Sequence, residues 1–192
     1  MNFDKIKSYA KINLSLSITG KLNELHKIES LIAFVDLYDV ILLKKIKFDK
    51  HHIVFEGRFS KNINSNNTVS KLLKILEKKK LLKQKFYIKI IKKIPQKAGL
   101  GGGSMNAASL LNYFVRKKII RVNKKQIFEI TRNIGSDVIL GLNLSNSVVT
   151  SNNEIKTFKN CKKLYTLIVK PNFGCSTKYI YSQVKKLEKA KL

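Results

Sequence analysis

The residues from Pro95 to Asn106 read PQKAGLGGGSMN and place four glycines within five positions. The run follows an alternating apolar segment, Phe86–Ile90, which is typical of a strand, and it precedes residues 107–115, where apolar residues recur at helical spacing. Glycines between a strand and a helix let the backbone approach an anion and point several N–H groups at it. Ser104, expected at the start of the helix, would direct the positive end of the helix dipole at the same anion. The chemistry that this stretch could support is phosphate binding.

A glycine cluster between a strand and a helix can also be a plain turn. The stretch is not a Walker A loop, because no Gly-Lys-Ser/Thr follows, and it lacks the acid downstream of a dinucleotide fingerprint. The complete pattern, Pro-x-x-x-Gly-Leu-Gly-Gly-Gly-Ser before an alanine-rich helix, resembles the phosphate-binding motif of the GHMP small-molecule kinases. The triple glycine followed by Ser-x-Asn-Ala-Ala narrows the resemblance to the branch that phosphorylates 4-diphosphocytidyl-2-C-methyl-D-erythritol.

The resemblance implies ATP and Mg²⁺ as cofactors. It assigns ATP binding to Pro95, Gln96, Lys97, Ala98, Gly99, Leu100, Gly101, Gly102, Gly103, Ser104 and Met105. The loop of this family usually carries two consecutive serines, and here the second position is Met105. Ser104 is therefore the loop hydroxyl expected near Mg²⁺.

Two further motifs supply candidate catalytic residues. Residues 8–14 (SYAKINL) resemble the family motif PAKINL with Tyr9 in place of the proline, and residues 135–139 (GSDVI) resemble its Gly-Ala/Ser-Asp-Val-Pro. Alone, Lys11 could be a solvated strand residue and Asp137 a cap or turn residue. The resemblance implies that Asp137 accepts the proton of the substrate alcohol, and that Lys11 holds this carboxylate ionised and steadies the transferred phosphoryl group.

The resemblance also implies a cytosine pocket for the small-molecule substrate. Residues that match its motifs are Asn13, His26, Thr177 and Tyr181. His26 would read the base through hydrogen bonds and Tyr181 would stack on it, although the family aromatic before His26 is Leu25 here. The alternatives are a structural histidine and a tyrosine at the edge of the core.

The composition predicts a soluble cytoplasmic protein with a packed core. Hydrophobic residues make up 44% of the 192 residues, which supports burial of a core. Cys161 and Cys175 match neither a disulfide framework nor a metal cluster, which favours a reducing compartment. The first residues lack the apolar region of a signal peptide, and no stretch has the length of a membrane span, so we expect no membrane partner.

The formal charge of +27 is typical of a nucleic-acid binder. Only four basic residues are arginine, however, and lysines occur in every segment instead of in one tail. This distribution indicates adventitious basicity, with attraction of phosphorylated ligands as a contribution, and we expect no nucleic-acid partner. A basic nucleic-acid-binding module and an inactive kinase fragment remain the alternative functions.

The expected fold is α+β, with the ribosomal protein S5 domain 2-like topology of the GHMP kinase N-terminal domain. Besides the elements flanking the loop, the patterns predict strands at 3–20, 40–49, 51–57, 147–151, 155–158 and 164–169, and helices near 69–76 and 124–133. Asp36 and Asp39 are expected to flank a turn and to carry no chemistry.

Family members continue through a C-terminal α+β domain. We therefore expect residues 1–160 to form the N-terminal domain and residues 161–192 to begin a truncated second one. In its first helix, Ile180, Val184 and Leu187 would form an apolar stripe that needs a covering partner, so this segment could mediate association.

Overall fold

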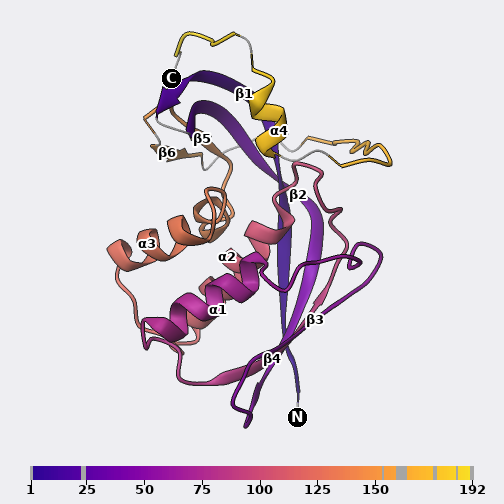
Figure 1. Ribbon diagram of the computed structural model, residues 1–192, viewed down its shortest axis with the longest axis vertical. Helices are drawn as coiled ribbons and strands as arrows, with labels where there is room; N and C mark the ends of the chain where they lie inside the picture. The colour runs from indigo at the N-terminus through magenta and orange to yellow at the C-terminus, as the bar shows by residue number, and fades with distance from the viewer. Residues whose placement is uncertain are drawn as a thin grey trace. The chain divides into compact units, whose positions relative to one another are not determined.

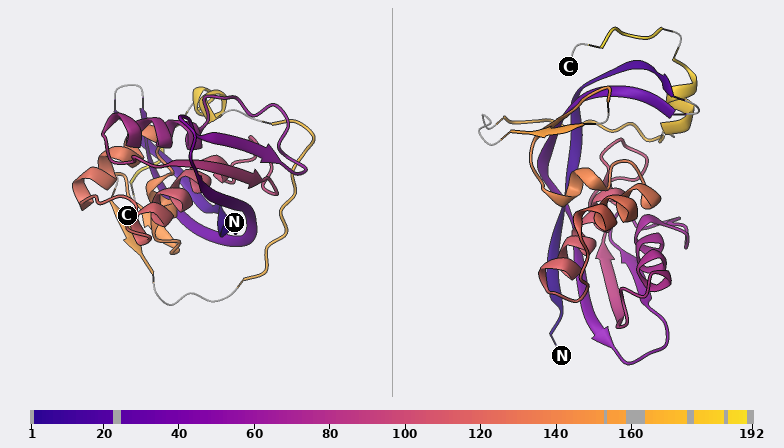
Figure 2. Two further views of the ribbon diagram at one scale, coloured as in Figure 1. Left: turned by 90° about the horizontal axis from the view of Figure 1, so that it is seen from below. Right: turned by 90° about the vertical axis from the view of Figure 1, so that its left-hand side faces the viewer.

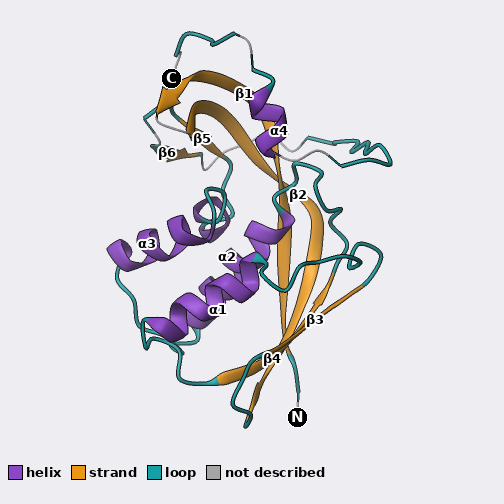
Figure 3. Cartoon of the chain, viewed as in Figure 1, coloured by secondary structure: helices purple, strands orange, loops and turns teal. Residues whose placement is uncertain are grey.

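The computed structural model describes residues 2–22, 25–152, 154–158, 164–174, 177–184 and 186–190. These residues form a mixed α+β structure, which confirms the expected fold class (Figure 1 and Figure 3). Its elements are β1 (Asp4–Leu22), β2 (Leu25–Ile46), β3 (His52–Glu56), α1 (Thr68–Lys78), β4 (Lys85–Ile91), α2 (Gly102–Arg116), α3 (Lys124–Ile134), the 3-10 helix η1 (Ile139–Leu142), β5 (Ser147–Val149), β6 (Ile155–Thr157) and α4 (Thr177–Ser182). They divide into two compact units, which are described separately.

The first unit contains residues 1–10, 36–95 and 101–143. In it β2 runs antiparallel to β4, with Val40 opposite Ile91, and β3 runs parallel to β4, with His52 opposite Tyr87. A parallel pair needs a crossover connection, and α1 supplies it between β3 and β4. Helices α1, α2 and α3 cover one face of these strands, as the views in Figure 1 and Figure 2 show.

The core of the first unit lies between those strands and helices. Alternate residues of β4 are buried, because side chains of a strand point to opposite faces in turn. The buried side chains are mainly Ile41, Leu43, Phe86, Ile88 and Ile90 from the strands, and Leu72, Leu76, Leu110, Leu111, Phe114 and Ile130 from the helices. Full burial of one such side chain contributes about 1.5–3 kcal/mol, so this layer fixes where α2 begins relative to β4.

Two of the three helices begin at asparagine caps. The Asn67 side chain accepts hydrogen bonds from the amides of Val69 and Ser70 at 3.0 Å each. Asn123 and Gln126 form a reciprocal capping box at the start of α3. These caps satisfy amides that have no partner within a helix.

The second unit contains residues 11–35, 96–100 and 144–192. Here β2 pairs antiparallel with β5, with Ser30 opposite Val149, and β5 pairs with β6. Strand β1 pairs with β2. Both units combine segments that are far apart in the sequence, so they do not correspond to the family domains. The domain boundary expected near residue 160 therefore stays a prediction.

Two elements expected near the C-terminus were wrong. Residues 164–169 form no strand, and their apolar side chains point into solvent, with Tyr165 97% exposed. Apolar alternation gives a strand only where neighbouring strands pair with it and one face is buried. The helix at Thr177–Ser182 ends before Val184 and Leu187, so the expected stripe does not form on one helix.

Two further expectations are corrected by continuous elements. Asp36 and Asp39 do not flank a turn, because β2 runs unbroken from Leu25 to Ile46 and contains both. Ser104 does not begin α2 but is its third residue, because the helix already starts at Gly102. Among the described residues, no helix is both long and apolar enough to cross a membrane.

His51, just before β3, is a titratable group whose side chain is only 7% exposed. Its Nδ1 accepts a hydrogen bond from the Phe86 amide at 3.0 Å, and its ring stacks on Phe86 with centroids 6.2 Å apart. Burial is the main cause that lowers the pKa of His51 below 6.5, with Lys85 lowering it further and Glu77 opposing both. The unfolded chain therefore takes up a proton at His51 before the folded chain does. The stabilising contribution is present above about pH 6.5 and is lost as the pH falls through the folded-state pKa.

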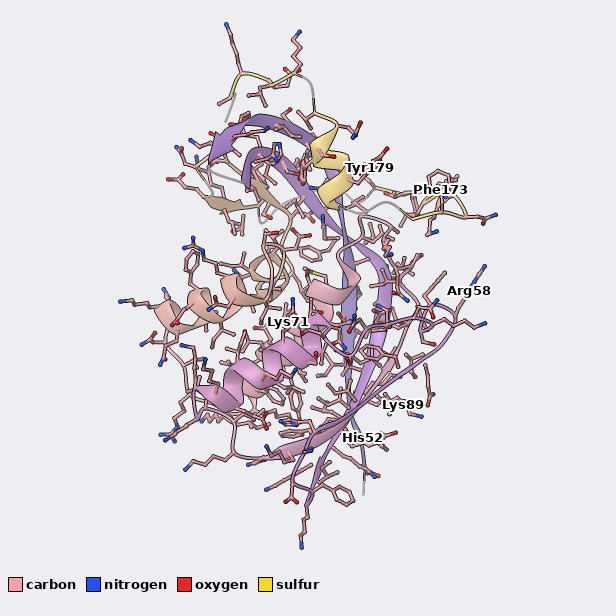
Figure 4. All side chains as sticks on the ribbon, in the orientation of Figure 1. His52, Arg58, Lys71, Lys89, Phe173 and Tyr179 are labelled. Atoms are coloured by element: carbon pink, nitrogen blue, oxygen red, sulfur yellow. The ribbon has the colours of Figure 1, made fainter. Side chains whose placement is uncertain are left out.

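We expect His51→Asn to reduce the loss of stability on acidification, because the asparagine oxygen can still accept the Phe86 amide but does not titrate. Urea unfolding at about pH 7 and about pH 5 should show a smaller fall in the free energy of unfolding than for the parent chain. His52→Asn is the matched control, since His52 is exposed and stacks on Tyr87 on the other side of β4 (labelled in Figure 4). An equal pH dependence in His51→Asn and the parent would contradict this account.

Candidate active site

The glycine loop leads directly into the N-terminus of α2. Gly101 precedes the helix in the left-handed conformation, with φ of 66°, and this glycine has no side chain that could cap the helix. The first intrahelical hydrogen bond runs from the Met105 amide to the Gly101 carbonyl at 2.9 Å. The amides before Met105 lack helical acceptors and carry the positive end of the helix dipole. This end of α2 is built to face an anion.

Neighbouring side chains fix the first turn of α2. A side chain at Gly102 would meet Ile94, because a Cβ there would lie 2.9 Å from the Ile94 Cγ2. The Thr68 hydroxyl, in the first turn of α1, donates a hydrogen bond to the Gly103 carbonyl at 2.6 Å. Glycine at position 102 therefore allows close packing, and Thr68 holds the next residue in place.

Ser104 faces the segment that carries Asp137. The Ser104 Oγ lies 3.9 Å from where a Cβ on Gly135 would be, so the first turn of α2 lies against the end of α3. Asp137 follows in a tight turn, in which its carbonyl accepts the Leu140 amide at 3.2 Å and the Gly135 carbonyl accepts the Val138 amide at 3.1 Å. The first unit thus brings the predicted base and the predicted metal-side hydroxyl to neighbouring segments.

Met105 points away from this end of the helix. It is fully buried, and a Cβ on Gly141 would lie 2.9 Å from its Sδ. The thioether thus fills the space between α2 and η1. Only the backbone of Met105 could take part in phosphate binding, and its side chain is a packing residue.

Lys11 and Asn13 belong to a hydrogen-bonded chain in the second unit. The Lys11 ammonium donates to the Asn13 Oδ1 at 2.6 Å, and the Asn13 Nδ2 donates to the Ser30 hydroxyl at 2.6 Å. The Lys11 amide also donates to the carbonyl of Leu100, in the glycine loop, at 3.1 Å. The structure therefore brings Lys11 to the loop segment 96–100 and Asn13 to Lys11, and Lys11 is only 7% exposed.

The predicted base-binding pair also lies in the second unit. The rings of His26 and Tyr181 stack on each other, with centroids 5.0 Å apart and planes inclined by 18°. The His26 Nε2 is buried and has no hydrogen-bond partner among the described residues. Rings with centroids this close are in direct contact, so binding of a base between them would require the rings to separate. Thr177 begins α4, but its side chain lies outside the described residues.

Sequence reasoning missed two contributors to this region. Asp39 is fully buried in the first unit and forms an ion pair with Lys92. The signal was the alternation Asp39, Ile41, Leu43, which places the carboxylate on the core face once β2 is recognised as continuous. Gly174 packs against the loop in the second unit, since a Cβ there would lie 2.8 Å from the Lys97 Cβ.

Comparison with known proteins identifies the class of kinase that the glycine loop resembles. The family described as "GHMP kinases N terminal domain" matches residues 67–149. A solved 4-(cytidine 5'-diphospho)-2C-methyl-D-erythritol kinase superposes with a TM-score of 0.65 at 24% identity, over 81% of this chain and 55% of that one. A homoserine kinase from Cytophaga hutchinsonii superposes with a TM-score of 0.57 at 18% identity, over 96% and 62%. The fold and the loop are those of a GHMP-type kinase domain.

Sequence relatives are more specific. A 4-diphosphocytidyl-2-C-methyl-D-erythritol kinase from Pelagibacter ubique is 60% identical over 190 residues, 98% of this chain and 68% of that protein. One from Clostridium botulinum is 35% identical over 183 residues, 93% of this chain and 64% of that protein. The chain belongs to the 4-diphosphocytidyl-2-C-methyl-D-erythritol kinase family, and it spans about two thirds of these relatives. The nucleic-acid-binding alternative is not favoured by these relationships.

We expect Gly141→Ala to destabilise the first unit, because the added methyl would lie 2.7 Å from the Ala108 Cβ and 2.9 Å from the Met105 Sδ. Overpacking of this kind costs about 1–3 kcal/mol, measurable by urea unfolding. Gly20→Ala is the matched control, since its nearest atom would lie at 3.6 Å, and it should change stability by less than about 0.5 kcal/mol. Equal stabilities of the two variants would show that α2 and η1 are not packed as described.

Proposed function

We propose that this chain acts as an ATP-dependent kinase, which binds ATP and performs phosphoryl transfer to the 2-hydroxyl of 4-diphosphocytidyl-2-C-methyl-D-erythritol. This reaction is a step of the non-mevalonate route to isoprenoid precursors. The observation that carries the proposal is 60% identity to a kinase of this name over 98% of the chain. The uncapped N-terminus of α2 after the glycine loop supports it, because such a helix end favours a phosphate.

In the mechanism we propose, the amides at the start of α2 hold the ATP phosphates. Asp137 accepts the proton as the substrate oxygen bonds to the γ-phosphorus and the bond from that phosphorus to the β-phosphate oxygen breaks, leaving ADP. Lys11 stabilises the ionised carboxylate and the charge on the transferred group. Lys11 and Asp137 belong to different compact units, and their joint action rests on the family motifs.

The residues at the loop fit a magnesium ion bound mainly through ATP. Mg²⁺ typically keeps several waters and binds through phosphates with only one or two protein ligands. The described residues contain no group of three or more histidines, cysteines or carboxylates that could hold a metal by themselves. The Ser104 hydroxyl, in the first turn of α2, is the ligand that we assign. When bound, Mg²⁺ would neutralise phosphate charge.

We assign the cytosine to His26 and Tyr181. The buried His26 Nε2 lacks a protein partner among the described residues, and a buried polar atom of this kind gains most from a ligand hydrogen bond. The base would enter by separating the two stacked rings and would replace their mutual contact with its own stacking. Asn13, linked to Lys11 at 2.6 Å, would orient the sugar alcohol near the transferred phosphate.

We expect the parent chain to release ADP in the presence of ATP, Mg²⁺ and 4-diphosphocytidyl-2-C-methyl-D-erythritol, and Asp137→Asn to lower kcat by about a hundredfold or more. The dissociation constant of ATP should change by less than about threefold, because the phosphate amides are untouched. A coupled ADP assay and calorimetry measure the two quantities.

The matched control is Asp49→Asn, an exposed aspartate in the loop after β2. It should leave both quantities unchanged. Turnover of Asp137→Asn within threefold of the parent would remove Asp137 from the mechanism. ATP binding without turnover by the parent would instead identify an inactive kinase fragment.

We expect Tyr181→Ala to weaken substrate binding roughly five- to hundredfold, since stacking contributes about 1–3 kcal/mol per base. ATP affinity should stay the same. Tyr179→Ala is the control on the same helix, because Tyr179 is 60% exposed (labelled in Figure 4). If ATP binding falls and substrate binding does not, the two pockets have been assigned the wrong way round.

A further inference from the structure

The Asp39 carboxylate collects four hydrogen bonds although it is completely inaccessible to solvent. Its Oδ1 accepts the amides of Lys93 at 2.7 Å and Ile94 at 2.9 Å. Its Oδ2 accepts the ammonium of Lys92 and the side-chain amide of Asn106, the latter at 3.0 Å. All five residues belong to the first unit.

These donors stand at the two ends of the glycine loop. Directly after β4, the Lys92 amide donates a hydrogen bond to the Glu56 carbonyl, at the end of β3, at 2.7 Å. The next two amides, of Lys93 and Ile94, leave the sheet and enter the loop. Asn106 lies in α2, just beyond the loop exit. The Asp39 carboxylate therefore binds both the end of β4 and helix α2. It also binds the Lys92 ammonium, whose Nζ lies 3.3 Å from where a Cβ on Gly102 would be.

Stability alone does not explain a charged pair at this place. A buried ion pair can often be replaced by apolar side chains of similar volume with no loss of stability, whereas removal of one partner is costly. An apolar pair, however, offers no acceptor to the amides of Lys93 and Ile94. What the carboxylate supplies, and an apolar pair does not, is a set of hydrogen-bond acceptors that fixes the loop ends.

We propose that Asp39 is a positioning residue of the phosphate loop, which holds the end of β4 and the first turns of α2 in the geometry that binds the ATP phosphates. Lys92 is its counter-ion and is not a free phosphate ligand. The proposal deepens the proposed function and rests on it for the identity of the anion. The geometry of the loop ends can be tested without nucleotide.

The test compares three variants of the full chain. Asp39→Asn keeps one acceptor for the two amides but leaves the Lys92 ammonium without its charge partner. Asp39→Asn/Lys92→Met removes that ammonium, and Asn106 can turn its Oδ1, which has no hydrogen-bond partner in the described part of the chain, toward the new side-chain amide. Asp39→Leu/Lys92→Met keeps an apolar pair but no acceptor. Asp36→Asn is the control, an exposed aspartate on the same strand.

Two quantities are measured: amide hydrogen exchange of residues 93–106 compared with α1, and ATP affinity by calorimetry. In Asp39→Leu/Lys92→Met we expect loop exchange at least tenfold faster and the dissociation constant of ATP at least tenfold higher, while α1 keeps its protection. Asp39→Asn should show the same loosening of the loop. The Asp39→Asn/Lys92→Met double variant should return both quantities to within about threefold of the parent, as should Asp36→Asn.

Loop exchange and ATP affinity of Asp39→Leu/Lys92→Met within threefold of the parent would overturn the proposal. If that variant does not fold, the comparison of Asp39→Asn with its double variant decides: absence of rescue would overturn the proposal as well. A parent chain that does not bind ATP would refute the proposed function, and the exchange pattern would still decide whether Asp39 fixes the loop.

Discussion

The constraint on which the structure depends is the open N-terminus of α2. The other two long helices begin with asparagine side chains that satisfy their first amides, whereas α2 begins after Gly101, which has no side chain to do so. Unsatisfied amides at a helix end are tolerated where water or an anion can reach them. Three contacts fix the position of this helix end. Ile94 packs against Gly102, and the Thr68 hydroxyl donates a hydrogen bond to the Gly103 carbonyl. The Met105 side chain fills the space between α2 and η1.

Local patterns predicted much of this architecture. The alternation before the loop and the helical spacing of apolar residues each depend on a few neighbouring residues, so the sequence alone located α1, β4, α2 and α3. The strand proposed at 164–169 was wrong, because pairing partners decide whether an apolar run becomes a strand and the sequence does not display them. Asp39 was dismissed for the same reason, since only the continuity of β2 places its carboxylate in the core.

Site residues that belong to a sequence motif could be predicted, whereas those brought to the site only by packing could not. Lys11, Asp137 and the loop were found through residue patterns, whereas the contact of Gly174 with Lys97 joins positions 77 residues apart and has no local signature. The two compact units divide the loop between them, with residues 96–100 in one and 101–106 in the other. Each unit therefore contributes part of the backbone of the glycine loop.

The burial of Met105 has a consequence for chemical durability. The chain contains two methionines, and Met105 is the one within the loop motif, fully buried against Gly141. Oxidation to the sulfoxide requires that the oxidant reach the sulfur, and it converts an apolar side chain into a polar one. Peroxide therefore cannot attack this thioether until α2 separates from η1. The rate at which Met105 is oxidised to the sulfoxide would therefore measure how often α2 separates from η1. Once formed, the polar sulfoxide would prevent the two helices from packing together again.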